Sequence, residues 1–356
     1  MPTSYYPILK TTIAEMRALK NLNSSTLDYI TPILELTKSR KSKNNQESCV
    51  YRKIEEIKDI VNENEFILDL TSIESLTNEQ IESFQYDNNG FENWCNFISD
   101  VCDQNLNVVP VLIAYPDSRI EELELESQQL CAASKKIAVR IPICEPDLED
   151  LFSILRQFIR QNYSSIGYII FDSGYIFDEI TDVSPLVDII SSFYSELPNS
   201  YKGKTIFSSS SFPASTLEKI TGDKFDNSFR LQTIPLFTRI QEKLTQLGVT
   251  NQICFGDYAC IHPYRNESKA YNWIPRIDYP TQDIIYFSRN RREEGGYIEC
   301  AKKISALNRF KSDNLICWGM SEIKKTSIGD PGGKSPSYWI SVRSNIHMSR
   351  MALING

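Results

Sequence analysis

The stretch IAVRIPICEPDLEDLFSILRQFIRQNYSSIGYIIFD, residues 137–172, contains the unit from which we predict the fold. It begins with the apolar run 137–142 and ends with a second apolar run at 167–172. Between them, a proline and several carboxylates open a segment whose large apolar residues recur at helical spacing, which is typical of an amphipathic helix. Two short apolar runs joined by such a helix predict parallel strands with a crossover connection.

The same unit recurs along the chain. Apolar runs occur at 5–10, 29–36, 66–70, 108–113, 137–142, 167–172, 204–209 and 252–258. Amphipathic stretches separate the runs, and two helical pieces, 214–220 and 234–247, precede the last one. Eight strand–helix units predict an α/β fold of the TIM-like (β/α)8 barrel type. An open, doubly wound sheet is the alternative, but no GxGxxG or GxxxxGK[ST] motif follows the first run, which argues against a dinucleotide-binding or P-loop version.

The residues after the eighth run do not continue the pattern. They contain a further apolar run at 284–287 and a helical stretch at 298–307, and they are too few for a second barrel. We therefore predict a barrel over residues 1–259. Residues 260–356 are predicted to form a C-terminal extension that packs on the barrel rim and completes the same globular unit.

Composition limits the function classes. The chain has 356 residues, of which 41% are hydrophobic, and 38 Lys and Arg against 46 Asp and Glu give a net charge of −8. This balance argues against a general nucleic-acid or membrane-surface binder. No apolar run reaches the roughly 18 residues of a membrane span, so we expect a cytoplasmic protein without a membrane partner. Nine cysteines without a CxxC pair, and only two histidines, favour buried free thiols over a zinc site or disulfides.

Acidic residues end four of the predicted strands. These candidate catalytic acids are Glu35, Asp69, Asp172 and Asp257. In a barrel the active site lies at the C-terminal ends of the strands, where paired carboxylates can serve as general acid and base. They can also hold Mg²⁺ or another divalent cation, although the sequence requires no cofactor. The alternative is structural, because Lys10 and Arg140 can neutralise two of the acids.

Six further residues are candidates for binding a substrate or ligand. They are Lys10, Ser209, Tyr258, Arg289, Arg343 and His347. Lys10 and Arg289 would neutralise a substrate anion. Ser209 belongs to a run of hydroxyls before a predicted helix, where backbone N–H groups bind anions or the hydroxyls simply cap the helix. His347 would be a base or a packed core residue.

Four short motifs occur in order along the chain. They are Tyr6-Pro7-Ile8-Leu9-Lys10, Thr31-Pro32-Ile33-Leu34-Glu35, Phe255-Gly256-Asp257-Tyr258 and the terminal Trp318-Gly319 … Trp339 … Arg343 … His347. Together they resemble the Beta protein family over nearly the whole chain. The family pattern has Asp after Trp-Gly and two adjacent histidines near the end, whereas Met320 and Ile346 stand at these places here. These departures put a catalytic role of the tail in doubt, but a packing role would survive them.

The resemblance implies a setting rather than a reaction. Members occur in prophages and other mobile elements, and the family's founding gene lies in a small cassette linked to the exclusion of competing phages. We therefore expect a component of an anti-phage defence system that acts through partner or ligand binding, the partner coming from the same gene cassette or from a phage. The alternative is a barrel hydrolase of phosphodiester or glycosidic bonds that uses the strand-end carboxylates. Whether the protein is an enzyme stays open, and a nucleic-acid partner is the least expected because of the net negative charge.

Overall fold

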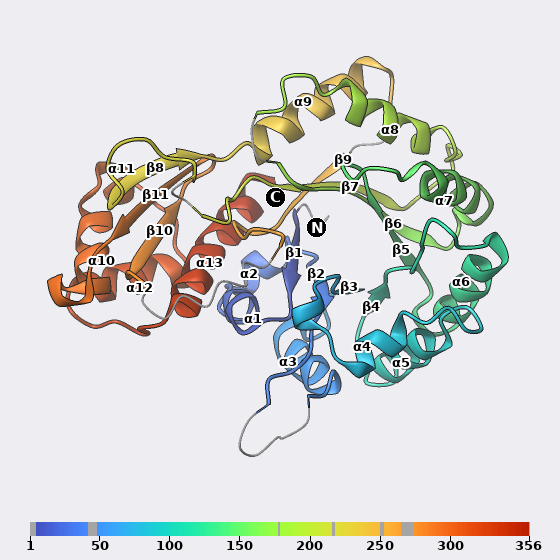
Figure 1. Ribbon diagram of the computed structural model, residues 1–356, viewed down its shortest axis with the longest axis horizontal. Helices are drawn as coiled ribbons and strands as arrows, with labels where there is room; N and C mark the ends of the chain where they lie inside the picture. The colour runs from blue at the N-terminus through green and yellow to red at the C-terminus, as the bar shows by residue number, and fades with distance from the viewer. Residues whose placement is uncertain are drawn as a thin grey trace.

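The computed structural model describes residues 5–355, except 42–47, 177–178, 216–217, 250–252 and 265–272. Within these described residues, eight parallel strands form a barrel surrounded by helices (Figure 1). The strands are β1 (Tyr5–Lys10), β2 (Ile33–Leu36), β3 (Phe66–Leu70), β4 (Val108–Pro110), β5 (Ile137–Pro142), β6 (Ile166–Tyr175), β7 (Lys204–Ser210) and β9 (Ile253–Asp257). Hydrogen-bonded neighbours follow the order β4-β3-β2-β1-β9-β7-β6-β5, and a bridge between Val111 and Ala138 joins the two ends. The predicted TIM-like barrel is confirmed.

Amphipathic helices cover the outer face of the barrel. They are α1 (Ile13–Lys20), α2 (Ser24–Leu27), α3 (Tyr51–Val61), α4 (Glu79–Phe84), α5 (Glu92–Cys102), α6 (Ile120–Ser134), α7 (Glu149–Asn162), α8 (Ser184–Tyr194) and α9 (Thr233–Gln246). In α7, the buried residues include Leu151, Leu155 and Phe158, whose spacing predicted the helix. Burial of each such side chain stabilises the fold by roughly 1.5–3 kcal/mol. The helical shell is therefore held by the apolar stripes visible in the sequence.

Alternate side chains of each barrel strand point inward, as strand geometry requires. Tyr6, Ile8, Ile67 and Ile170 belong to one buried cluster that fills the barrel. Gly256 is needed here, because a Cβ at this position would lie 2.3 Å from the Ser208 hydroxyl oxygen. The polar residues that end the strands on the inward side therefore rest on a closed apolar core.

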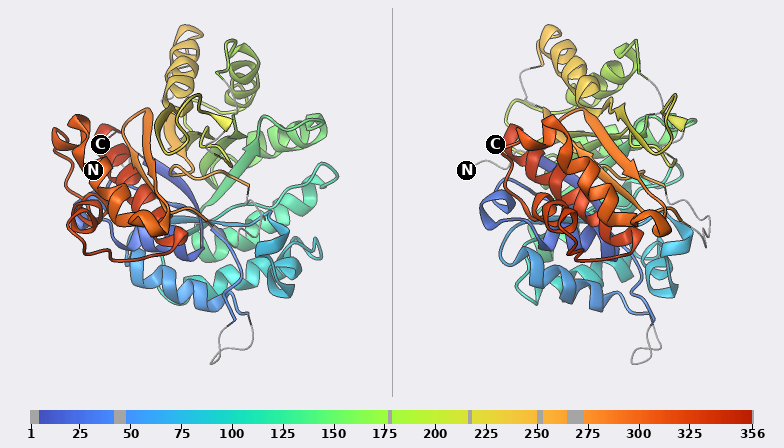
Figure 2. Two further views of the ribbon diagram at one scale, coloured as in Figure 1. Left: turned by 60° about the vertical axis from the view of Figure 1, so that its left-hand side comes forward. Right: turned by 90° about the vertical axis from the view of Figure 1, so that its left-hand side faces the viewer.

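The C-terminal residues form a second layer beside the barrel, seen face-on in the right-hand view of Figure 2. An antiparallel sheet in the order β10-β11-β8 lies against helices with their own apolar core. Its elements are β8 (Asp226–Arg230), β10 (Arg276–Pro280), β11 (Ile284–Arg289), α10 (Gly296–Ala306), α11 (Asn308–Lys311), α12 (Trp318–Ser327) and α13 (Pro336–Asn355). Helix α13 packs against both α1 and β10, so it joins the two layers.

The boundary between barrel and extension at residue 259 stays a prediction. Two sets of contacts cross it. Strand β8 precedes this boundary but pairs with β11 beyond it, and α13 lies beyond it but packs against α1 and β1. Residues 216 and 217 of the expected helix 214–220, and the first residue of the expected run 252–258, lie outside the described residues.

All nine cysteines are free. In the part of the chain that the structure describes, no helix has the length and apolar character of a membrane span.

Candidate functional site

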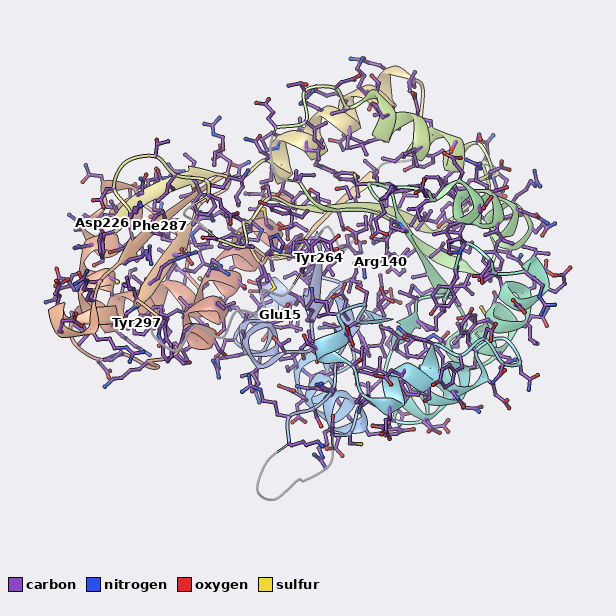
Figure 3. The ribbon with its side chains drawn as sticks, in the orientation of Figure 1. Glu15, Arg140, Asp226, Tyr264, Phe287 and Tyr297 are labelled. Atoms are coloured by element: carbon purple, nitrogen blue, oxygen red, sulfur yellow. The ribbon has the colours of Figure 1, made fainter. Side chains whose placement is uncertain are left out.

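Arg140 lies at the mouth formed by the C-terminal ends of the barrel strands (Figure 3). Its Nη1 donates to Glu35 Oε1 at 2.9 Å and to Asp69 Oδ2 at 2.6 Å. Its Nη2 and Nε donate to Asp172 Oδ2 at 2.6 and 3.1 Å. The three acids come from β2, β3 and β6, so the barrel brings together three of the four predicted catalytic acids.

Lys10 and Tyr258 complete this group, which we call the Arg140 cluster. Lys10 Nζ lies 3.1 Å from Glu35 Oε2. The Tyr258 hydroxyl donates to Asp172 Oδ2 at 2.6 Å and accepts from Arg140 Nη2 at 2.9 Å. Two cations therefore face three carboxylates, which leaves a formal charge of −1 when all are ionised. Every carboxylate in the cluster accepts at least one charge-assisted hydrogen bond, the stronger kind.

The three carboxylates differ in their electrostatics. Burial raises the pKa of Glu35, but the positive charges of Lys10 and Arg140 lower it by more, so the net shift is downward. For Asp69 the effect of burial exceeds that of Arg140, and its pKa is raised. The Asp69 side chain is also the most accessible of the three, at 16% exposure. Asp69 is thus the member of the cluster best placed to hold a proton near solvent.

The carboxylates of this cluster already surround a cation. The guanidinium of Arg140 stands between Glu35, Asp69 and Asp172, where a divalent ion would need the same oxygens. Among the described residues, no group of three His, Cys, Asp or Glu side chains is arranged to hold a metal ion. In this arrangement the acids do not fit the divalent-cation site that the sequence allowed.

Asp257, the fourth predicted acid, lies outside the Arg140 cluster. Its Oδ1 accepts from the Tyr5 hydroxyl at 2.5 Å and from the Ala259 amide at 2.8 Å. Its Oδ2 lies 2.5 Å from Nε2 of His347, which belongs to α13. Asp257 and His347 are 3% and 2% exposed. We call this group the Asp257 clamp, because it ties the last helix to strand β9.

The two partners of the clamp shift each other's pKa. Burial lowers the pKa of His347, but the negative charge of Asp257 raises it by more, aided by Cys260, to about 10. Burial raises the pKa of Asp257, and the positive charge of His347 lowers it by more, so it ends below its usual value. The clamp is therefore an ion pair at neutral pH, and His347 has no free base form to offer.

The remaining predicted ligand-binding residues are dispersed. Ser209 points away from the mouth and lines, with Asp257, a void of about 10 Å³. Its hydroxyl has no hydrogen-bond partner among the described residues. Arg289 lies on β11, where its Nη1 donates to the Lys224 carbonyl at 3.3 Å. Arg343, on α13, donates from Nη1 to Asp278 Oδ2 at 2.7 Å.

A large cavity lies between the barrel mouth and the C-terminal layer, with a volume of about 1590 Å³. Its cationic lining residues are Lys10, Lys38, Arg40, Lys41, Lys53, Arg276 and Arg343. Its acidic lining residues are Glu15, Glu79, Glu82 and Asp278. The lining is therefore basic in a chain whose net charge is −8. Of the predicted residues, Lys10 and Arg343 line this cavity, and Arg289 does not.

Two features of the site were not predicted from the sequence. Arg140 was expected only to neutralise a neighbour, yet it is the centre of the cluster. The signal in the sequence that could have shown this is the position of Arg140 in β5. It lies two residues after Ala138, whose side chain points into the barrel, so its own side chain points inward as well. Lys38, Arg40 and Lys41 occur in the polar segment that follows β2, and loops at this end of a barrel strand carry binding residues.

Comparison with known proteins gives a match over nearly the whole chain. A sequence model of the family described as Beta protein matches residues 5–353. Protein beta of Enterobacteria phage P4 is 28% identical over 354 residues, which cover 98% of this chain and 92% of that protein.

Two solved structures give weak structural matches. The spore cortex-lytic enzyme SleL of Bacillus megaterium QM B1551 matches with a TM-score of 0.37 and 11% identity, covering 97% of this chain and 74% of that chain. A chitinase from Chromobacterium violaceum ATCC 12472 matches with a TM-score of 0.37 and 8% identity, covering 97% and 99%. Likenesses at this score support no inference about activity.

Proposed function

The chain belongs to the Beta protein family, and we propose that it acts in anti-phage defence for a mobile element by binding an anionic ligand in the cavity at the mouth of its barrel. The basic lining of this cavity is the observation that carries the proposal. A concave site lined by one sign of charge concentrates ligands of the opposite sign. The defence setting comes from the family resemblance, and the ligand's charge comes from the cavity.

Three of the cavity's cations are available to a ligand. Lys10, Lys53, Arg276 and Arg343 each pair with a carboxylate. Lys38, Arg40 and Lys41 are exposed and form no ion pair with any residue that the structure describes. An incoming anion would meet these three side chains without first breaking an internal ion pair.

Binding is favoured over hydrolysis by the state of the acids. A general base must be free to accept a proton from the reacting group. In the Arg140 cluster, Glu35 is held by two neighbours and Asp172 by three, and Asp257 is closed off in its clamp. The acids of the cluster are therefore better placed to stabilise the barrel mouth than to accept a proton from a substrate.

The test is phage protection in cells that carry the gene with its native neighbours. We expect the double variant Lys38→Glu, Arg40→Glu to lose protection, measured as plaque numbers, while its melting temperature stays near that of the wild type. The matched control is the charge-reversed double variant Lys58→Glu, Lys324→Glu. Both lysines are exposed and neither lines the cavity. Full protection by the cavity variant would overturn the proposal. Co-purification from the same cells would show a protein partner from the cassette.

A hydrolase is the second candidate, and Asp69 favours it. Its pKa is raised, chiefly by burial, and its side chain reaches solvent, which suits a general acid. In the same assay, loss of protection by a folded Asp69→Asn variant with intact ligand binding would support chemistry at the barrel mouth. Unchanged protection by this variant would leave binding as the function.

A further inference from the structure

Two exposed aromatic side chains line the same cavity as the unpaired cations. Tyr264 is 54% exposed and Trp273 is 36% exposed, whereas Trp339, in the same lining, is 3% exposed. The guanidinium of Arg292 lies 4.3 Å from the centre of the Trp273 ring. This contact is a cation–π interaction, which holds the ring in place. Exposed, held rings offer a flat partner a surface on which to stack.

Tyr264 brings the aromatic part of the cavity close to the Arg140 cluster. The pKa of Tyr264 is raised by burial and by nearby acids that include Asp172, and Arg140 opposes this shift. Figure 3 shows Tyr264 beside Arg140 near the centre of the molecule. Its amide donates to His262 Nδ1 at 3.2 Å, which fixes the backbone of this segment. A Cβ placed on Gly174, at the end of β6, would lie 3.4 Å from the Tyr264 hydroxyl, so the ring reaches over the barrel mouth.

Arg343 lines the cavity, but it is held by a carboxylate of the protein itself. Arg343 is 6% exposed, and its Nη1 is engaged by Asp278. Its Nε has no hydrogen-bond partner among the described residues. This Nε is buried, so a ligand in the cavity does not reach it without movement of the side chain. The charge offered to a ligand therefore comes from the exposed cations Lys38, Arg40 and Lys41.

We propose that the cavity binds a nucleoside phosphate, with the base stacked on Trp273 or Tyr264 and the phosphates held by Lys38 and Arg40. Base stacking on aromatic rings beside a positively charged groove is how proteins bind single strands of nucleic acid without sequence preference. The cavity, at about 1590 Å³, exceeds the roughly 300–1,000 Å³ of ordinary ligand pockets and accommodates a nucleotide with several phosphates. The inference rests on the proposed function and narrows its anionic ligand to one chemical class.

Calorimetric titration of the purified full chain with four probes tests this inference. The probes are ATP, inorganic tripolyphosphate, adenosine and a 5′-phosphorylated trinucleotide of DNA. We expect a probe with both base and phosphate to bind at least tenfold more tightly than tripolyphosphate or adenosine. A preference for ATP would identify a free nucleotide, and a preference for the trinucleotide would identify the end of a strand.

Variants separate the two parts of the site. Lys38→Glu with Arg40→Glu should abolish binding, and Trp273→Ala should weaken it by about tenfold or more. Tyr264→Ala serves as a second aromatic variant if Trp273→Ala lowers the melting temperature. Lys58→Glu and Tyr86→Ala are the matched controls, since both side chains are exposed and neither lines the cavity.

Two results would overturn the inference. Equal affinity for tripolyphosphate and ATP, with no effect of either aromatic variant, would show an anion site without a base site. Absence of binding by both ATP and the trinucleotide would exclude nucleoside phosphates altogether. In either case the proposed function is tested separately. It is supported if the Lys38→Glu, Arg40→Glu variant loses phage protection, and it is overturned if protection is unchanged.

Discussion

The Arg140 cluster and the Asp257 clamp are built from the same sequence feature, an acid at the end of a barrel strand, yet they differ in surroundings, charge balance and access to solvent. The cluster reaches the cavity through Lys10, contains more carboxylates than cations and includes a partly exposed side chain. The clamp is closed, pairs one carboxylate with one imidazolium and lies beneath the last helix. The comparison teaches that the end of a strand does not by itself define a functional acid.

What separates the two groups is the side of the strand. Consecutive residues of a strand point to opposite faces. Tyr258 reaches inward to Arg140, so Asp257, one residue earlier, points outward to α13. The same alternation places Ser209 outward, in the void beside Asp257. An acid that lies two residues after an inward-pointing side chain of its strand also points inward, to the barrel mouth. An acid that lies one residue after such a side chain points outward, to the helices.

Removal of Arg140 should have the largest effect on stability. Arg140→Met leaves three carboxylates together with only Lys10 to offset them, and breaking buried ion pairs in this way costs roughly 3–5 kcal/mol. We expect urea unfolding at pH 7 to show a loss of about 4 kcal/mol. Arg140→Lys, which keeps the charge but not the forked geometry, should lose less. A loss below about 1 kcal/mol for Arg140→Met would mean that the carboxylates do not depend on the guanidinium.

Asp257→Asn should rank next, with a loss of about 3 kcal/mol, because it leaves the buried His347 without its counter-charge. Asp69→Asn is the matched change in the other group. It removes a charge from a cluster with an excess of carboxylates, at a partly exposed position, and should cost under about 1 kcal/mol. Equal losses for the two variants, compared by urea unfolding, would contradict the distinction between clamp and cluster.

The clamp should also make stability depend on pH. The folded protein keeps the His347 proton up to about pH 10, whereas the ordinary pKa of histidine is 6.5. The stabilisation is therefore complete below pH 6.5 and is lost as the pH rises toward 10, at up to about 1.4 kcal/mol per pH unit. We expect the free energy of unfolding to fall by about 2 kcal/mol between pH 7 and 8.5. In the His347→Gln variant this slope should disappear, and a slope unchanged by the substitution would assign it to other groups.

The smallest effect on stability is expected in the cavity. Lys38→Ala with Arg40→Ala removes exposed, unpaired side chains, and such changes stay within about 0.5 kcal/mol. In calorimetric titration, the same variant should lose most of the affinity of the protein for ATP. This result would complete the contrast between residues that hold the fold and residues that hold a ligand. A large loss of stability would show that these cations also serve the fold.

The barrel was predictable because its strands and helices bury residues at the regular periods of 2 and 3.6. Strand β8 was not predicted, because the sequence DNSFR, Asp226–Arg230, buries only Phe229 and owes its conformation to pairing with β11. Helix α13 was not predicted either. From Ser341 to Ser349 every residue is buried, polar ones included, so the helix has no exposed polar face to reveal its period.

The convergence of Glu35, Asp69 and Asp172 followed from the position of strand ends in a barrel. The role of Arg140 did not, because a basic residue inside an apolar run gives no sign of how many carboxylates it will meet. The pairing of Asp257 with His347 joins residues 90 positions apart through a helix that the periodicity did not show. Sequence patterns thus predicted which strand ends meet, and the three-dimensional structure was needed to show which side each acid takes.

The docking of α13 against α1 also sets the order in which the protein can be completed during its synthesis. The Asn345 side chain donates to the Ala18 carbonyl across 327 positions of the sequence. At the usual 5–20 residues per second of translation, roughly 20 to 60 seconds separate the appearance of these two residues. For that time the first strand and helix exist without the helix that covers them, and their apolar surface is open to chaperones and to other nascent chains. Slower translation of the segment before α13 would lengthen this exposure and raise the fraction of chains that aggregate.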